Sequence, residues 1–175
     1  VDDYAGYKAL FACGVIEVGC MAHARRKFFE LHKANQNPVA GEALQRISEL
    51  YEIESRGREL ANAERQALRE REALPKLQAM QDWLQRTRDT VADGGGLARA
   101  IDYSLKRWTA LSRYAQSAIL PIDNNPVENV IRPIALGKKN WLFTGSERSG
   151  RSAAAIQSLL ATAKFNDLEP AAWLK

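Results

Sequence analysis

Carboxylate and amide side chains are concentrated in the segment Asp123-Asn124-Asn125-Pro126-Val127-Glu128. Its order of residue types predicts a helix start, with Asn125 as the N-cap, Pro126 as the first residue and Glu128 completing a capping box. A carboxylate on the first turn of a helix is also a ligand that a hard metal ion accepts. The spacing alone favours the capping role for Glu128, and a metal-binding role stays open.

A basic stretch follows the same segment. Arg132 is spaced to pair with Glu128 on one helix face, and Pro133 predicts a kink or an end of that helix. Lys138 and Lys139 come soon after a helix start, where backbone N–H groups favour phosphate. These three cations are therefore candidates for holding a phosphate backbone.

An aromatic residue, Trp141, lies just beyond the two lysines. Residues 140–143 are interpreted as a short strand or an extended loop. Trp141 either stacks on an extruded base or anchors the terminal helix in a core.

Acidic residues also open the sequence, as Asp2 and Asp3. They read as the end of a strand that precedes a helix, which is where open α/β sheets place ligands. Aspartates at strand ends are also common without any function, so this signal alone is weak.

A third cluster joins Cys20 and His23, spaced as half of a zinc site. The other candidate ligands, Cys13 and His32, are poorly spaced, so zinc is disfavoured and both cysteines are expected as free thiols. Arg25, Arg26 and Lys27 follow and point to three helix faces, so at most two of them serve one phosphate groove, and a solvated helix face is the alternative.

Composition narrows the class of protein. The 175 residues suit one core, or one core with an elaboration, and 46% hydrophobic with 26% charged residues is typical of a globular protein. No apolar run is long enough to span a bilayer, and no targeting segment is visible, so a cytoplasmic protein is expected. It would be nucleoid-associated if it binds DNA. The net charge of +4 permits nucleic-acid binding without establishing it. The abrupt first residues suggest a fragment.

Hydrophobic periodicity predicts the elements that must position these residues. Residues 4–11 and 21–34 read as helices, the second ended by Asn35-Gln36-Asn37-Pro38, and the β-branched run 15–18 reads as a strand. A terminal helix is expected around residues 153–163.

The middle of the chain, residues 40–115, reads as a helical block. Its 13 Lys and Arg and 12 Asp and Glu are mixed along the sequence, as on solvated helix faces. Gly57, Pro75 and the glycines at 94–96 interrupt every heptad-like run, so a bundle is favoured over a coiled coil. The apolar faces are predicted at Leu44, Ile47 and Tyr51; at Leu77, Met80, Leu84 and Val91; and at Leu97, Ile101, Leu105 and Trp108.

Four blocks in order resemble the catalytic region of the insertion-sequence 66 family of DDE transposases. They are Val1-Asp2-Asp3-Tyr4-Ala5-Gly6-Tyr7, Cys20-x2-His23-Ala24-Arg25-Arg26-Lys27-Phe28, Ile122-Asp123-Asn124-Asn125-x2-Glu128 and Gly137-Lys138-Lys139-Asn140-Trp141-Leu142-Phe143. The likeness continues to the end of the chain, through residues 158–164 and 170–174. Several blocks in register are far more specific than any one of them.

The resemblance implies an α/β fold, predominantly helical in this fragment, that is a partial RNase H-like fold with a helical insertion between the second and third acidic residues. Residues 1–39 and 116–175 would form the catalytic core, and residues 40–115 the insertion. Asp2 maps to the second catalytic acid and Glu128 to the third, while the first lies upstream of Val1.

The resemblance also implies cofactor and partners. The acids of such a site bind two Mg²⁺ (or Mn²⁺) ions, a pair expected only with the missing upstream aspartate. DNA, as transposon ends and target, is the expected partner, with a homo-oligomer in the active complex, possible helper proteins and no membrane. DNA-binding roles fall to Arg25, Arg26, Arg132, Lys138 and Lys139, and supporting roles to His23, Asn124, Asn125 and Trp141.

The parent protein is thus expected to cleave transposon ends and join them to target DNA, with the fragment inactive alone. Two alternatives stay open. One is a non-catalytic helical DNA-binding or scaffold module, in which Glu128 only caps its helix. The other is an RNase H-like nuclease.

Overall fold

The computed structural model describes Gly6, residues 8–141 and residues 144–173, and the side chains of residues 138–141 are outside the described part. Packing divides the chain into one unit of residues 1–124 and another of residues 125–175, and each is described by itself. In the described ranges, no helix combines the length and the apolar character that a membrane crossing requires.

The first unit begins with the short helix α1, Lys8–Ala12, which Gly14 ends with a positive φ of 88°. The strand predicted at residues 15–18 is wrong, because this stretch has no strand partner in the described chain. Instead it lies along α7, Trp108–Ser112, where the Gly19 N–H donates to the carbonyl of Ala110 at 2.8 Å. The β-branched run therefore marks an extended connection and not a sheet.

Helices α2, Met21–Asn35, and α3, Pro38–Gly57, are present as the sequence predicts, and they pack on one another as a hairpin. Gln36 takes the left-handed conformation that ends α2, with φ of 53°. Asn37 then caps α3, since its side chain accepts the N–H of Ala40 at 2.9 Å while Pro38 opens the helix. One short polar sequence thus ends one helix and starts the next.

Three helical segments then run without a break: α4, Asn62–Leu68; the π-helical turn η2, Arg69–Ala73; and α5, Leu74–Arg88. Pro75, which was predicted to interrupt a heptad-like run, does not end the helix. The Leu74 N–H donates to the carbonyl of Arg69, five residues back, so the turn before the proline is widened. A wider turn moves the preceding carbonyls away from the proline ring, which lets the helix continue.

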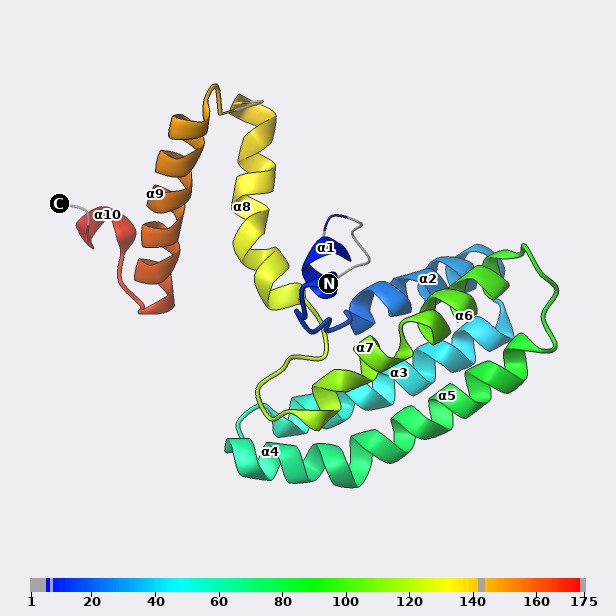
Figure 1. Ribbon diagram of the computed structural model, residues 1–175. Coiled ribbons are helices and arrows are strands. Elements are labelled where there is room, and N and C mark those ends of the chain that lie inside the picture. Colours follow the sequence, from blue (N-terminus) through cyan, green and yellow to red (C-terminus); the bar gives the residue numbers. More distant parts are fainter. Residues whose placement is uncertain (1–5, 7, 142–143, 174–175) are drawn as a thin grey trace. The chain divides into compact units, whose positions relative to one another are not determined.

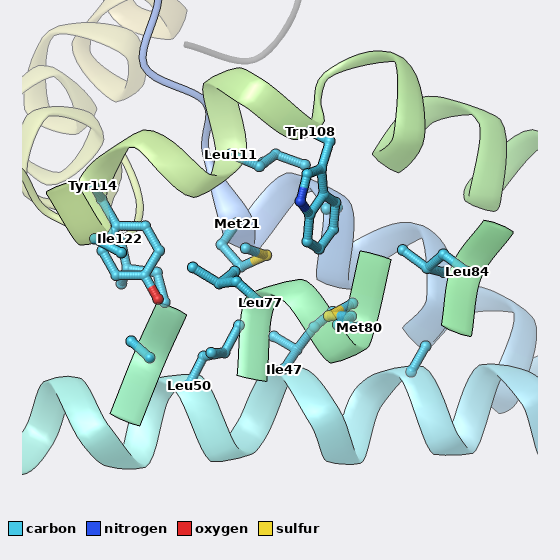
Figure 2. Packing of buried hydrophobic residues seen from close by; sticks show 14 of the residues in the cluster. Met21, Ile47, Leu50, Leu77, Met80, Leu84, Trp108, Leu111, Tyr114 and Ile122 are labelled. Carbon is cyan, nitrogen blue, oxygen red and sulfur yellow. The ribbon is translucent and has the colours of Figure 1, made fainter. Parts of the chain in front are cut away.

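The bundle is completed by α6, Gly96–Lys106, by α7 and by the 3₁₀ turn η3, Arg113–Gln116. Helices α2, α3, α5, α6 and α7 gather into this one bundle (Figure 1). Its core is apolar and spans all of these helices, as Figure 2 shows for Ile47 and Leu50 of α3 facing Leu77 and Met80 of α5.

The second unit contains α8, Asn125–Trp141; α9, Glu147–Phe165; and α10, Pro170–Trp173. Two predictions about α8 are wrong, the first only in part. The helix does not end at Pro133, because it continues through this proline to Trp141, and the alternative of a kink there stays a prediction. Asn140 and Trp141 belong to this helix and not to a strand or loop, while residues 142–143 are outside the described part.

The fold class is therefore confirmed in its coarser form. The described residues are predominantly helical and include no strand, so the sheet of the α/β assignment is not present in them. Residues 40–115 are helical as predicted, and α2 packs on α3 and α6. The grouping of residues 1–39 with 116–175 in one catalytic core stays a prediction.

Candidate functional site

An irregular connection, residues 117–124, leads from η3 to the start of α8. Its last part is anchored by Ile122, whose side chain is buried in the bundle core. The carbonyl of Ile122 also accepts the backbone N–H of Met21, the first residue of α2, at 3.1 Å. The end of this connection is thus held against the beginning of α2.

The next residue, Asp123, is a buried carboxylate, only 8% exposed. The hydroxyl of Tyr51, on α3, donates to its Oδ2 at 2.8 Å. Burial, reinforced by the hydrogen bond to Asp123, raises the pKa of Tyr51 far above its usual value. The hydroxyl therefore stays protonated at neutral pH and serves as a hydrogen-bond donor.

The third residue of the anchored segment, Asn124, is tied down through its backbone. Its N–H donates to the Sγ of Cys20 at 3.3 Å. Cys20 is a buried free thiol directly before α2, and Cys13 is exposed and also free, as predicted. His32 holds the α2–α3 turn through a 3.1 Å contact between Nδ1 and the carbonyl of Asn37.

Arginines of the helical block hold the earlier part of the connection. Arg65 Nη1 donates to the carbonyl of Ala118 at 3.3 Å, and Arg69 donates to the carbonyl of Ser117. Arg69 is itself buried and forms a bidentate pair with Glu54 of α3. The connection is therefore fixed at several points by residues 40–115.

Glu128 lies in the first turn of α8, which begins at Asn125, within one residue of the predicted start. Its side chain is half-buried, and Arg132, one turn further along the helix, is exposed. The partial positive charge of a helix N-terminus stabilises a carboxylate at this position. His23 is likewise half-buried, in the first turn of α2.

Lys138 and Lys139 lie at the opposite end of α8 from Asn125. The prediction that they sit close to a helix start is wrong, since a helix rising about 1.5 Å per residue places them about 20 Å from it. Cations near a helix C-terminus are favoured by the helix dipole. Their backbone, like that of Trp141, is helical, and their side chains are outside the described part.

The basic run on α2 faces away from the bundle core. Arg25, Arg26 and Lys27 are exposed between the buried Ala24 and Phe28. Two of these cations stack on aromatic rings: Arg25 lies 5.7 Å from the ring centre of Phe29, and Lys27 lies 4.4 Å from that of Tyr103. The exposed surface of α2 is therefore basic.

Comparison with known proteins assigns the chain to a family. The profile of the family described as Transposase IS66 family matches residues 1–152. The chain belongs to this family. Two uncharacterized proteins of Sinorhizobium fredii are similar to it. The protein y4hP is 36% identical over 89% of this chain and 30% of its own length. The protein y4jD is 32% identical over 99% of this chain and 35% of its own length. The chain thus spans about a third of the curated relatives it matches, and no solved structure matches it.

Among the residues that the IS66 resemblance singles out, Asp2 and Asp3 are outside the described part of the chain. Their approach to Glu128 therefore stays a prediction. The structure does bring Asn124 to Cys20, so two blocks of the family pattern that lie far apart in sequence meet in one place.

Two residues of this IS66 chain were missed as site residues by sequence reasoning. Tyr51 was assigned only to the apolar face of a helix, and Asp123 was quoted in the motif without a role. No local pattern predicts the burial of Asp123, since a chain neighbour of a core residue can be exposed, as Pro121 is beside Ile122. Once buried, a carboxylate needs a donor. No sequence pattern identifies Tyr51 as that donor, since the two residues are 72 positions apart.

Proposed function

We propose that this chain is the C-terminal part of the catalytic region of a DDE transposase, and that its longer parent protein cleaves transposon ends and joins them to target DNA. Membership of the IS66 family carries the proposal. In support, the Asp-Asn-Asn-x-x-Glu block opens a helix with Glu128 in its first turn. A carboxylate on a rigid helix is well suited to hold a fixed position in a catalytic site.

In this proposal Asp2 and Glu128 bind metal together with an aspartate from the upstream part of the parent protein. The donor chemistry fits Mg²⁺ or Mn²⁺, because Glu128 offers hard carboxylate oxygens from a half-buried position. The bound ions supply activation of the attacking water or 3′-hydroxyl and stabilisation of the leaving oxygen. The role of this chain is to hold two of the three carboxylates, so alone it is inactive.

The DNA contacts in this proposal come from cations that position the backbone without reading sequence. Arg25 and Arg26 are exposed on α2, and Arg132 is exposed on α8. Lys138 and Lys139 are retained as backbone contacts near the far end of α8. The active complex on paired ends is proposed to be a homo-oligomer.

The test uses the full-length parent protein and a plasmid that carries the ends of its own element. Glu128→Ala should abolish Mg²⁺-dependent end cleavage and strand transfer, while DNA affinity is retained. The matched control is Glu147→Ala, since Glu147 is also a glutamate in the first turn of a helix of the second unit, exposed and paired with Arg151.

The outcomes separate the proposal from its alternatives. If Glu128→Ala retains cleavage and only lowers stability by the roughly 0.5–2 kcal/mol of a lost cap, the capping role is correct and the catalytic one is refuted. Cleavage without any strand-transfer product would identify a nuclease instead of a transposase.

A further inference from the structure

The hydrogen bond between Tyr51 and Asp123 joins two parts of the chain with different proposed roles. Tyr51 belongs to α3, inside the helical block of residues 40–115, and Asp123 to the segment that leads into α8. Burying a carboxylate costs free energy unless it is hydrogen-bonded, so the Tyr51 hydroxyl compensates part of that cost. An apolar residue in place of Asp123 would avoid the cost altogether, so stability alone gives no reason for this pair.

Consecutive residues of the same segment are held from two sides, by the start of α2 and by α3. The Ile122 carbonyl accepts the Met21 N–H from the start of α2, Asp123 accepts the Tyr51 hydroxyl from α3, and the Asn124 N–H donates to Cys20. Apolar packing tolerates small slides of a segment, whereas hydrogen bonds are directional and fix its register. These bonds therefore fix the path of the chain through Ile122, Asp123 and Asn124, and Asn124 is the residue directly before α8.

The support behind Tyr51 is rigid. Its neighbour Leu50 and Ile47, one turn earlier, are fully buried in the core that Figure 2 shows. Helix α3 is capped by Asn37 and packs along α2, the other helix that holds the segment. Groups held by rigid elements can position a site more accurately than groups on a free loop.

We propose that Tyr51 and Asp123 are positioning residues for the catalytic glutamate, through which the helical block fixes the start of the helix that carries Glu128. The inference rests on the proposed function of Glu128. It gives the helical block a defined part in catalysis, because α3 supplies one side of the anchor. Neither residue is proposed to touch DNA or the reacting atoms.

The test compares Tyr51→Phe and Asp123→Leu with the wild type in the full-length protein, by measuring end cleavage against Mg²⁺ concentration. Residues that support metal ligands typically cost 10- to 100-fold in metal affinity or activity when changed. We expect the Mg²⁺ concentration for half-maximal cleavage to rise about tenfold in each variant, with DNA affinity unchanged because no phosphate contact is removed. Asp123→Asn keeps an acceptor for the Tyr51 hydroxyl and should be the mildest change.

A second measurement does not depend on activity. Amide hydrogen exchange, recorded without metal, reports directly on the bonds donated by the Asn124 and Met21 N–H groups. Tyr51→Phe should accelerate exchange at both amides. The control is Tyr114→Phe, since Tyr114 is a buried tyrosine whose hydroxyl has no hydrogen-bond partner among the described residues, so the same chemical change should leave exchange and Mg²⁺ dependence as in the wild type.

The outcomes keep the two proposals apart. If the wild type cleaves, Glu128→Ala does not, and Tyr51→Phe matches Tyr114→Phe in both measurements, the positioning role is refuted while the catalytic role of Glu128 stands. If Glu128→Ala retains cleavage, the proposed function itself is refuted. Because one bond is involved, the double variant Tyr51→Phe/Asp123→Leu should be no worse than Asp123→Leu, and full additivity would also contradict the inference.

Discussion

Arg69 offers the sharpest test of how the helical bundle is held together. Its side chain is 3% exposed within the π-helical turn η2. The guanidinium pairs with Glu54 through contacts of 2.9 Å from Nε and 2.5 Å from Nη2. Nη1 donates to the carbonyl of Tyr114 at 3.0 Å and to that of Ser117. Nε, Nη1 and Nη2 of the guanidinium therefore each donate to at least one oxygen.

Replacing Arg69 by Met removes the charge and leaves those oxygens without their donor. Glu54 is only 15% exposed, so water cannot fully replace the guanidinium. Breaking a buried pair from one side typically costs about 3–5 kcal/mol, a large part of the roughly 5–15 kcal/mol that stabilises a domain. We expect Arg69→Met to lower the free energy of unfolding by about that amount.

Urea unfolding at 25 °C measures this loss. With a slope of about 2 kcal/mol/M, the midpoint should fall by roughly 2 M at unchanged slope. Arg71→Met is the matched control two residues away, since Arg71 is 67% exposed and solvent screens its pair with Glu72, so this variant should leave the midpoint nearly unchanged. Adding Glu54→Leu to Arg69→Met should recover part of the loss, because no unpaired charge is then buried. Equal losses for Arg69→Met and Arg71→Met would refute this reasoning.

Two further predictions concern the same unit. Burial raises the pKa of Tyr51 and of Tyr114 in the folded chain. Above about pH 10 the unfolded chain therefore loses these protons before the folded chain does. The free energy of unfolding then falls as pH rises, by up to about 1.4 kcal/mol per pH unit for each tyrosine. Urea midpoints measured from about pH 9 upward should fall less steeply in Tyr51→Phe than in the wild type, and an identical slope would contradict the assignment. Gly19→Ala places a Cβ 2.9 Å from the backbone N of Leu111 and should cost about 1–3 kcal/mol, whereas Gly95→Ala meets no atom closer than 3.8 Å and should be nearly neutral in the same unfolding assay.

The helical pattern of the bundle was predictable because its signals are local. Apolar residues at helical spacing predicted buried faces, and Ala24, Phe28, Ile47, Leu84 and Ile101 are indeed buried. Other predicted positions pack only at the edge of the core: Leu31, Leu44, Tyr51, Val91, Leu97 and Leu105. The spacing predicts which side of a helix is apolar, while the extent to which each residue is buried depends on which other helix covers that side.

The errors come from residues whose effect depends on partners distant in sequence. A β-branched run becomes a strand only when another strand pairs with it, and residues 15–18 meet the backbone of α7 instead. Pro75 interrupts a heptad-like run in the sequence, yet the helix continues through it, because the π-helical turn before it accommodates the ring. Neither outcome follows from local propensity, since each depends on which backbone groups find a partner.

The candidate site shows the same division between local and distant signals. The helix start at Asn125 and the position of Glu128 in the first turn follow from capping chemistry, which is local. The anchor formed by Tyr51 and Cys20 was not predictable, because each contacts the Asp-Asn segment from far away in sequence. A motif thus identifies the residues that perform chemistry more readily than those that hold them in place.

The helical block contacts the connection before α8 largely through backbone carbonyls. Arg65 donates to the carbonyl of Ala118, and Arg69 to that of Ser117. A carbonyl is present in every residue, so such contacts fix the path of a segment without restricting its side chains. At Asp123 the block also engages a side chain of the connection, through the hydrogen bond from Tyr51. Leu120 and Ile122 pack on the bundle core. Changes at residues 117–119 and 121 should therefore be tolerated if they preserve the backbone path, and the sensitivity of the connection should be concentrated at Leu120, Ile122 and Asp123.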